Sequence, residues 1–489
     1  MESISEAKAR LAGVYDPARF ADSAGQFSKI LSSHLSRVLR GEGPVLPWTP
    51  PARQIAEASE SLAGNQESDL PDRFEEILNQ MLSRGINLHH PRYIGHQVAA
   101  PVPVAGLFDA IGATTNQAMA IYEMGPWSTA VENALVREMG SRVGWEADQF
   151  AGLITHGGSL ANLTALLTAR NVALPTGWET GLSKTEKAPV LVANGEVHYS
   201  VTRAAGLLGL GTHNVVRVPV DQSRRMTPEA LDNTLTDLKD RQVPVIAVTA
   251  CACSTLIGAF DPIREIAAVC EKHETWFHVD AAHGGGALFS EKHRHLLDGL
   301  ELADSVIIDA HKMMFVPGLC AFVLYKNKEH RFEAFRQDAP YLFDPTAPDL
   351  ADFDMGMKTI ECTKRAAGFG LWGIWSLYGS QLFADLIDVT FAAARQLYEK
   401  LRDAPDFEPI HEPESNIVAF RHTPAHLQNA RPDELGDHQL QLRRRLIESG
   451  KFYIVSTKID GVGALRAVLM NPLTTGDDLD ALLASIRTI

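Results

Sequence analysis

The chain has 489 residues, a formal net charge of −15 at pH 7, an apolar fraction of 45% and a charged fraction of 21%. This length allows two or three domains with a large buried core, and the composition is that of an ordinary globular protein, which excludes a disordered or fibrous chain. The negative charge repels phosphate backbones and anionic lipids, so we expect neither a nucleic-acid nor a membrane partner.

The first residues mix charged and apolar types and lack the uninterrupted apolar core of a secretory signal. No stretch approaches the roughly 20 apolar residues of a membrane span. The five cysteines lie in apolar segments and are odd in number, which favours reduced thiols over a disulfide framework. We therefore expect a cytoplasmic protein. Neither the pair Cys251 and Cys253 nor the histidines have partners at ligand spacing, so no metal site is expected.

Residues 1–89 are expected to form an N-terminal helical arm. The apolar spacing predicts helices up to about residue 85. Prolines at 44, 47, 50 and 51 interrupt this pattern, because successive prolines forbid a continuous helix. The arm should therefore consist of helices joined by a proline-rich turn.

Residues 90–385 are expected to form a large α/β domain. Short β-branched runs alternate there with amphipathic helical patterns such as 261–273. This alternation is typical of βαβ units around a mainly parallel sheet. The strands that we expect are 189–193, 215–220, 244–250, 276–279, 305–308 and 320–325.

Residues 386–489 are expected to form a smaller α+β domain. A long helical pattern over 385–402 precedes runs with strand character, and a final helix is expected near 477–487. The strands that we expect here are 417–421, 452–456 and 464–470.

A glycine turn follows the apolar run 151–154 and opens a helix through residues 163–170. Residues 155–162 are Thr-His-Gly-Gly-Ser-Leu-Ala-Asn, in which the glycines let a ligand approach the backbone and Ser159 can cap the helix. The helix N-terminus attracts an anion. The turn is neither a P-loop nor a dinucleotide fingerprint. Taken alone, it could be a phosphate site or a plain strand-to-helix turn.

Two charged residues follow expected strands further along the chain. Asp280 ends the run 276–279, where a buried carboxylate needs a partner such as a protonated ring nitrogen; a capping Asp is the alternative. Lys312 follows the run 305–308 and precedes Met-Met-Phe-Val. Apolar surroundings should lower the pKa of Lys312 and free its amine as a nucleophile, although an isolated lysine is more often a solvated surface charge.

An anion site, a carboxylate and an amine are what the phosphate, the pyridine nitrogen and the aldehyde of pyridoxal 5'-phosphate require. With these residues in this order, the chain resembles the group II pyridoxal-phosphate-dependent amino-acid decarboxylases, the family of the glutamate, cysteine sulfinate, diaminobutyrate and aromatic amino-acid decarboxylases. The resemblance extends from His90-Pro91-Arg92-Tyr93 to residues 470–475.

The resemblance implies an α/β fold-type-I enzyme, similar to aspartate aminotransferase, with a mainly parallel seven-stranded sheet and a small C-terminal domain. It also implies a homodimer that has its active site at the interface, with the arm taking part in dimer formation.

The resemblance also implies roles for individual residues. Lys312 would form the Schiff base with the cofactor, Asp280 would pair with its pyridine nitrogen, and His198 would stack on its ring. The further cofactor contacts that it implies are Gly158, Ser159, Ser254, Ala282, Asp309 and His311. The residues that we expect near the substrate are Asn116, His96, Arg466 and Tyr341. From the residues alone, Arg466 could equally belong to a structural ion pair.

Some positions depart from the family pattern. Asp309-Ala310 stands where Asn-Pro or Asp-Pro is usual, His283 replaces a common aromatic residue, and Cys253 occupies a frequent glycine position. In residues 337–357 the family carries a mobile catalytic tyrosine. Here Tyr341 comes early, and no other tyrosine occurs before Tyr378. We expect a mobile lid with an atypical proton donor.

The expected activity is decarboxylation of an L-amino acid to its amine and CO2 through an external aldimine and a quinonoid. Three alternatives stay open: an aldehyde-forming oxidative deaminase, an aminotransferase or lyase on the same fold, and a binding protein that retains only the fold. The substrate is also open, because residues 454–461 and 471–475 resemble the diaminobutyrate branch, whereas 258–262 resemble the glutamate and cysteine sulfinate branch.

Overall fold

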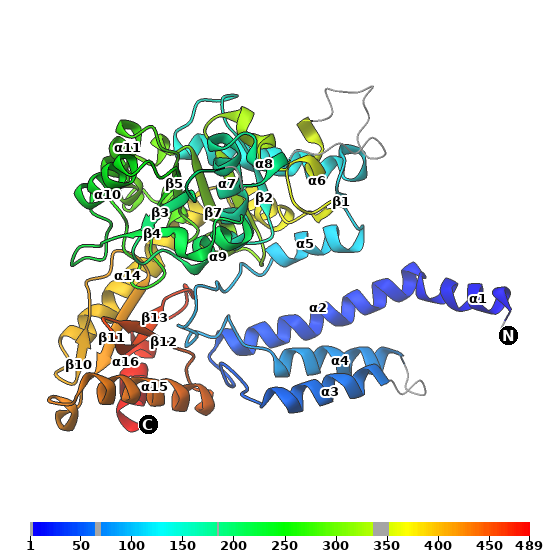
Figure 1. The fold of residues 1–489 in the computed structure, drawn as a ribbon. Coiled ribbons are helices and arrows are strands. Elements are labelled where there is room, and N and C mark those ends of the chain that lie inside the picture. The colour runs from blue at the N-terminus through cyan, green and yellow to red at the C-terminus, as the bar shows by residue number, and fades with distance from the viewer. Residues whose placement is uncertain (1–2, 64–69, 183–184, 336–351) are drawn as a thin grey trace.

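Three groups of elements follow one another along the chain (Figure 1). The computed structural model describes residues 3–63, 70–182, 185–335 and 352–489. None of the helices in these segments combines the length and the hydropathy that a bilayer span requires.

The first group consists of the helices α1 (Ile4–Val14), α2 (Pro17–Leu39), α3 (Pro51–Ala63) and α4 (Leu70–Arg84). The break between α2 and α3 contains Pro44, Pro47 and Pro50, and Pro51 begins α3. Asp16 caps α2 by accepting a hydrogen bond from the amide of Ala18 at 2.9 Å. Gln26 of α2 donates to the carbonyl of Pro71 at the start of α4, at 3.1 Å. Helix α1 projects past the ends of α3 and α4 (Figure 1).

The second group is built around a seven-stranded sheet. Its strands, in spatial order, are β2 (Ala151–Thr155), β8 (Ala321–Tyr325), β7 (Ser305–Asp309), β6 (Phe277–Asp280), β5 (Val245–Cys251), β3 (Val190–Asn194) and β4 (Val215–Val218). Strand β8 is antiparallel to both neighbours, and the other pairings are parallel. The expected strands are all present with ends displaced by at most two residues, which confirms the mainly parallel sheet.

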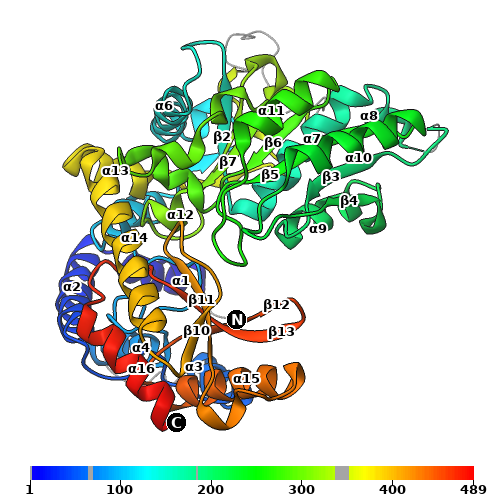
Figure 2. The same cartoon turned by 90° about the vertical axis from the view of Figure 1, so that its left-hand side faces the viewer.

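Helices and short 3-10 turns surround this sheet (Figure 2). Helix α7 contacts strands β2, β5, β6, β7 and β8. The helices of this group are α5 (Ala105–Thr114), α6 (Pro126–Val143), α7 (Gly158–Ala173), α8 (Gly177–Thr180), α9 (Tyr199–Leu207), α10 (Pro228–Asp240), α11 (Ile263–Lys272), α12 (Ala310–Met313) and α13 (Phe369–Tyr378). A small strand pair, β1 (Ala118–Met119) with β9 (Lys364–Arg365), lies beside them.

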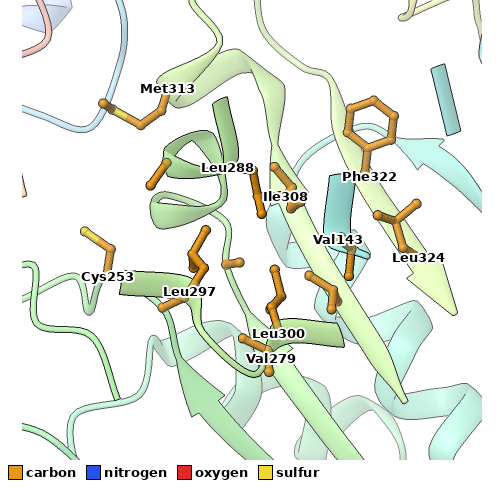
Figure 3. Packing of buried hydrophobic residues seen from close by; sticks show 14 of the residues in the cluster. Val143, Cys253, Val279, Leu288, Leu297, Leu300, Ile308, Met313, Phe322 and Leu324 are labelled. Carbon is orange, nitrogen blue, oxygen red and sulfur yellow. The ribbon is translucent and has the colours of Figure 1, made fainter. Parts of the chain in front are cut away.

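Both faces of the sheet are buried, as a parallel sheet requires. Along β7, Val306 and Ile308 belong to one hydrophobic cluster, and Ile307, on the opposite face, belongs to another. Figure 3 shows the first cluster, where Ile308 lies beside Leu288 of a 3-10 turn. The period of two along the strand therefore separates two cores.

The third group is an antiparallel sheet with the spatial order β10, β11, β13, β12, flanked by helices. Its elements are α14 (Gln381–Arg402), β10 (Phe407–Pro409), β11 (Ile417–His422), α15 (Pro432–Ser449), β12 (Val455–Ile459), β13 (Val462–Val468) and α16 (Gly476–Thr488).

One expected strand of this group was displaced. Residues 452–456 were predicted as a strand, but β12 begins only at Val455. The reason is that Tyr453 pairs instead with Tyr93, through a parallel bridge and a ring stack with 5.3 Å between centroids. The segment before β12 therefore ties the third group to the residues that follow the arm.

Candidate active site

The predicted cofactor residues meet at one edge of the large sheet. Asp280 ends β6, Lys312 lies in α12 directly after the adjacent strand β7, and Gly158 begins α7 after β2. Carboxyl ends of parallel strands share an edge, where ligands bind in α/β folds. A cavity of about 350 Å³ opens there. It is lined by every residue that the resemblance assigned to the cofactor: Gly158, Ser159, His198, Ser254, Asp280, Ala282, Asp309, His311 and Lys312.

The carboxylate of Asp280 is 8% exposed and is held by two donors. Its Oδ1 accepts from the amide of Ala282 at 3.1 Å, and its Oδ2 accepts from Nδ2 of Asn162 at 2.9 Å. A buried carboxylate is tolerated when hydrogen bonds satisfy it in this way. The two bonds fix its orientation at the cavity wall.

Lys312 carries an ion pair that sequence analysis did not foresee. Its Nζ lies 3.1 Å from Oδ2 of Asp309. Burial acts to lower the pKa of Lys312, but the carboxylates of Asp309 and Asp280 outweigh it, and the net pKa is raised above its usual value. The expectation of a lowered pKa was wrong. The residues after Lys312 are buried and apolar as expected, and the nearby acids reverse the direction.

His198 precedes α9 and caps it. Its Nδ1 lies 2.8 Å from Oγ of Ser200 and accepts from the amide of the same serine at 3.3 Å. Burial lowers the pKa of His198, and the positive charge of Lys312 adds to this lowering against the raising effect of Asp280. The imidazole is therefore neutral near pH 7 and presents a flat, uncharged ring to the cavity.

The glycine turn before α7 lies against Asp309. Gly157 has φ +106°, which favours glycine, and a Cβ at Gly158 would lie 2.6 Å from Oδ2 of Asp309. Glycine at 158 is thus needed for the close approach of the turn to β7. The expectation that Ser159 caps the helix was wrong: Gly157 is the N-cap residue, and no side chain bonds the first turn.

The expected substrate residues are placed differently. Asn116 and His96 are exposed and do not line the cavity in a single chain. Arg466 is 7% exposed, and its Nη2 donates to Oε1 of Gln97, a cavity residue, at 3.0 Å. Tyr341 lies outside the described residues.

Other cavity residues were not predicted as site residues. Asn162 follows Gly158 by one helical turn, so helix periodicity could have found it. His156 belongs to the glycine-turn motif of residues 155–162. Its Nδ1 lies 2.8 Å from Oε1 of Glu361, which comes from a distant segment of the chain. Gln97 carries no local signal, because its place depends on the contact with Arg466.

The cavity residues fit pyridoxal phosphate. Within the described part of the chain, Ser254 Oγ, Asp309 Oδ1 and His156 Nε2 are buried atoms without a hydrogen-bond partner. Buried polar atoms are normally satisfied, so unpartnered ones at a cavity indicate a polar ligand. An amine, a carboxylate, hydroxyl groups and a neutral ring complete the set of groups that this cofactor requires.

Comparison with known proteins agrees with this geometry. Residues 56–423 match the model of the pyridoxal-dependent decarboxylase conserved domain. The chain belongs to the pyridoxal-dependent decarboxylase family. The acidic amino acid decarboxylase GADL1 of Mus musculus is 30% identical over 454 residues, which cover 91% of this chain and 81% of the relative.

Solved structures share the whole fold of this family member. The crystal structure of mouse CSAD is 28% identical, has a TM-score of 0.88, and covers 97% of this chain and 99% of its own. The structure of Oryza sativa TDC with PLP and tryptamine matches at a TM-score of 0.88 with 20% identity, covering 97% and 98% of the two chains. The latter similarity concerns the fold alone.

These comparisons confirm the fold-type-I α/β architecture, the cofactor and the reaction class. The chain is a pyridoxal-phosphate-dependent carboxy-lyase that decarboxylates an amino acid. The aldehyde-forming, transaminating and non-enzymatic alternatives are not favoured, since the matched family model is that of a decarboxylase and GADL1 is named as an amino acid decarboxylase.

Proposed function

We propose that Lys312 holds pyridoxal phosphate covalently, that Asp280 binds its pyridine nitrogen and that His198 stacks on its ring. The observation that carries this proposal is the position of Asp280 and Lys312 at the ends of adjacent parallel strands, on one cavity. Gly158, Ser159, Ser254, Ala282, Asp309 and His311 complete the cofactor contacts in this proposal.

The chain's own groups orient the reaction. When bound, the cofactor supplies an electron sink for the electrons that the departing carboxyl group leaves behind. Asp280, fixed by two hydrogen bonds, holds a proton on the ring nitrogen. The raised pKa of Lys312 means that its Nζ must lose a proton before it attaches to an aldehyde. Oδ2 of Asp309, at 3.1 Å, is within reach to accept that proton.

We propose that Arg466 binds the substrate carboxylate. Burial lowers the pKa of Arg466 to about 10, so the guanidinium remains positive at neutral pH. No carboxylate is paired with it among the described residues, and its Nε is buried without a partner, which speaks against a structural ion pair. The similarity to a relative named for acidic amino acids supports an acidic L-amino acid as the substrate.

A panel of L-amino acids tests the substrate class. CO2 release should be fastest with glutamate, aspartate or cysteine sulfinate, and slower with 2,4-diaminobutyrate and aromatic amino acids. Fastest release from 2,4-diaminobutyrate would contradict the acidic class and leave the reaction class intact.

Removing Lys312 tests the cofactor assignment. Lys312→Ala should abolish the visible absorbance band of a lysine-bound cofactor and reduce CO2 release to background, because no other lysine among the described residues lines the cavity. Lys328→Ala, which removes an exposed lysine, is the control and should keep both. A visible band that persists in Lys312→Ala would refute the role of this residue.

We further propose a cytoplasmic homodimer, divided into residues 1–89, 90–385 and 386–489, in which Asn116 and His96 reach the substrate only after association. Large apolar side chains are exposed on the arm and on α5, where Leu107 and Ile111 are each 58% exposed. Exposed apolar patches of this kind are typical of protein interfaces. All five cysteines are free thiols, which supports a reducing compartment.

The proposed dimer can be tested by sedimentation, which reports the mass of the particle in solution. The wild-type protein should sediment as a dimer, and Leu107→Glu combined with Ile111→Glu should give an inactive monomer, because charges would be buried at the interface. Leu440→Glu changes a side chain on α15 that is also exposed, and should leave the dimer intact. A wild-type protein that is monomeric and active would disprove the proposal.

A further inference from the structure

A buried polar network lies behind the cavity, with Asn162 at its centre. Asn162 is 1% exposed. Its Nδ2 donates to Oδ2 of Asp280 at 2.9 Å and to Oγ of Ser200 at 2.9 Å. Its Oδ1 lies 2.8 Å from Nε2 of His278. The side chain therefore makes three hydrogen bonds, two to residues of β6 and one to a residue of α9.

The orientation of this amide follows from the carboxylate. Asp280 can only accept, so the amide nitrogen of Asn162 must face it and the oxygen must face His278. The oxygen accepts as well, which places the proton of His278 on Nε2. Burial lowers the pKa of His278 to about 4, so the ring is neutral and its Nδ1 accepts from Oγ of Ser305 at 2.8 Å. The hydroxyl of Ser305 in turn accepts from Nε1 of Trp276 at 2.9 Å.

The other branch reaches the stacking histidine. The hydroxyl of Ser200 accepts from Asn162, so its own proton points to Nδ1 of His198, at 2.8 Å. The amide of Ser200 donates to the same nitrogen at 3.3 Å. With Nδ1 accepting from two donors, the proton of the neutral His198 resides on Nε2.

We propose that Asn162 is a positioning residue that fixes both the carboxylate of Asp280 and the tautomer of His198. This proposal rests on the roles proposed above for these two residues. Each bond of the network runs in one direction, from Trp276 to the two site residues, and an inverted amide would set two acceptors against each other. The charged groups that act on His198 are Asp280, Lys312, Asp309 and Arg203. None of them bonds its Nδ1, so Ser200 alone among the described residues sets the tautomer there.

The first test replaces the amide with a carboxylate. Asn162→Asp removes both N–H donors of this side chain and places a second carboxyl group beside that of Asp280. The two carboxyl groups can form a hydrogen bond only when they share a proton. Loss of a hydrogen bond to a charged group lowers the binding affinity by about tenfold or more. We expect apoprotein of this variant to bind pyridoxal phosphate at least about tenfold more weakly at pH 8. The loss should be smaller at pH 6, where the shared proton is retained.

The matched control makes the same change on the same helix. Asn171, 2% exposed near the end of α7, donates to the carbonyl of Glu333 at 2.6 Å. Asn171→Asp should lower thermal stability but leave the cofactor affinity at both pH values close to that of the wild type. An affinity of Asn162→Asp equal to that of Asn171→Asp at both pH values would overturn the proposal.

The second test separates the two branches. Ser200→Ala keeps the bond between Asn162 and Asp280 and removes the hydroxyl donor from His198. Cofactor affinity should stay close to wild type. The acid limb of the kcat profile should move up by about 0.5–1 pH unit, because an Nδ1 without its donor protonates more readily. An unmoved acid limb would overturn the His198 branch, even if Asn162→Asp failed to fold.

A further variant distinguishes this inference from the proposed function. Asp280→Asn should bind pyridoxal phosphate yet lose most activity, because an amide does not hold a proton on the ring nitrogen. If Asp280→Asn is inactive but Asn162→Asp behaves as wild type, only the positioning role fails. If Asp280→Asn is fully active, the proposed role of Asp280 fails, and with it this inference.

Discussion

A buried ion pair anchors the strand that leads into the glycine turn. The Nζ of Lys364 lies 2.5 and 2.7 Å from the two carboxylate oxygens of Glu132 and donates to the carbonyl of Ile154 at 2.6 Å. The amide of Ile154 donates back to Glu132 at 3.1 Å. Both charged side chains are 3% exposed or less. The pair therefore joins α6, β9 and β2 just before the glycine turn.

Replacing one residue of this ion pair should lower the free energy of unfolding. Lys364→Met leaves the carboxylate of Glu132 buried without its partner, which costs about 3–5 kcal/mol of unfolding free energy. The double variant Glu132→Gln with Lys364→Met leaves no buried charge and should recover much of that loss. Thermal unfolding checks this order, and a single variant as stable as the double variant would contradict it.

At the scale of residues, the sequence predicted those cavity residues whose position follows from the neighbouring residues in the chain. Asp280 and Lys312 follow apolar strands, and a strand end is visible in a single segment. The link from Asn162 to His278 was not predictable, because it joins residues 116 positions apart. The raised pKa of Lys312 was missed for a related reason, since its direction depends on how close the carboxylates of Asp309 and Asp280 come in the folded chain.

At the scale of elements, helix α15 touches the hairpin of β12 and β13 through two glycines. A Cβ at Gly436 would lie 2.9 Å from the amide nitrogen of Gly463, and a Cβ at Gly463 would lie 2.7 Å from the carbonyl oxygen of Gly436. Both obstacles are backbone atoms, which cannot rotate away. The helix lies on the hairpin at a distance that side chains would not permit.

Gly436→Ala should therefore destabilise the protein. Overpacking costs about 1–3 kcal/mol, which exceeds the gain of about 1 kcal/mol from better helix propensity. Asp437→Ala, at the adjacent exposed position of the same helix, is the control and should change stability by less than about 0.5 kcal/mol. Scanning fluorimetry measures both variants. A melting temperature of Gly436→Ala at or above that of the control would show that the helix can shift outward freely.

Most elements were predictable because their periodicity is local. Strands of the large sheet alternate between two cores, and α14 and α16 have clear amphipathic patterns. The start of β12 was not predictable, because Tyr453 has a strand-like sequence but pairs with Tyr93. Of the lid expected over residues 337–357, only residues 352–357 are described; they include a 3-10 turn at Met355–Met357. The lid itself stays a prediction.

At the scale of the whole molecule, buried and half-buried histidines should dominate the response to acid. Burial lowers the pKa of His278, His411 and His438 to about 4 and that of His283 to about 3, from 6.5 in an exposed chain. Between pH 6.5 and 4 the unfolded chain binds protons at these sites and the folded chain does not. Asp261 acts oppositely, because burial raises its pKa to about 6 from 3.8.

The histidines outnumber this carboxyl group, so stability should fall as pH decreases from 6.5 to 4. The melting temperature of the cofactor-free protein, measured in steps over this range, checks the direction. His438→Gln removes one of the four sites and should make the decline shallower. A melting temperature that stays level or rises toward pH 4 would mean that the carboxyl groups dominate.

The position of β8 has a consequence for how the chain acquires its activity. Strand β8 comes last in the sequence of the large sheet, yet it lies between β2, the first, and β7. Strand β2, which leads into α7, cannot pair with the rest of the sheet until β8 has inserted between it and β7. Contacts between such distant segments form slowly, because chain entropy must be lost before they return free energy. We therefore expect capture of the cofactor to come late in folding, so that bound cofactor would report a complete sheet.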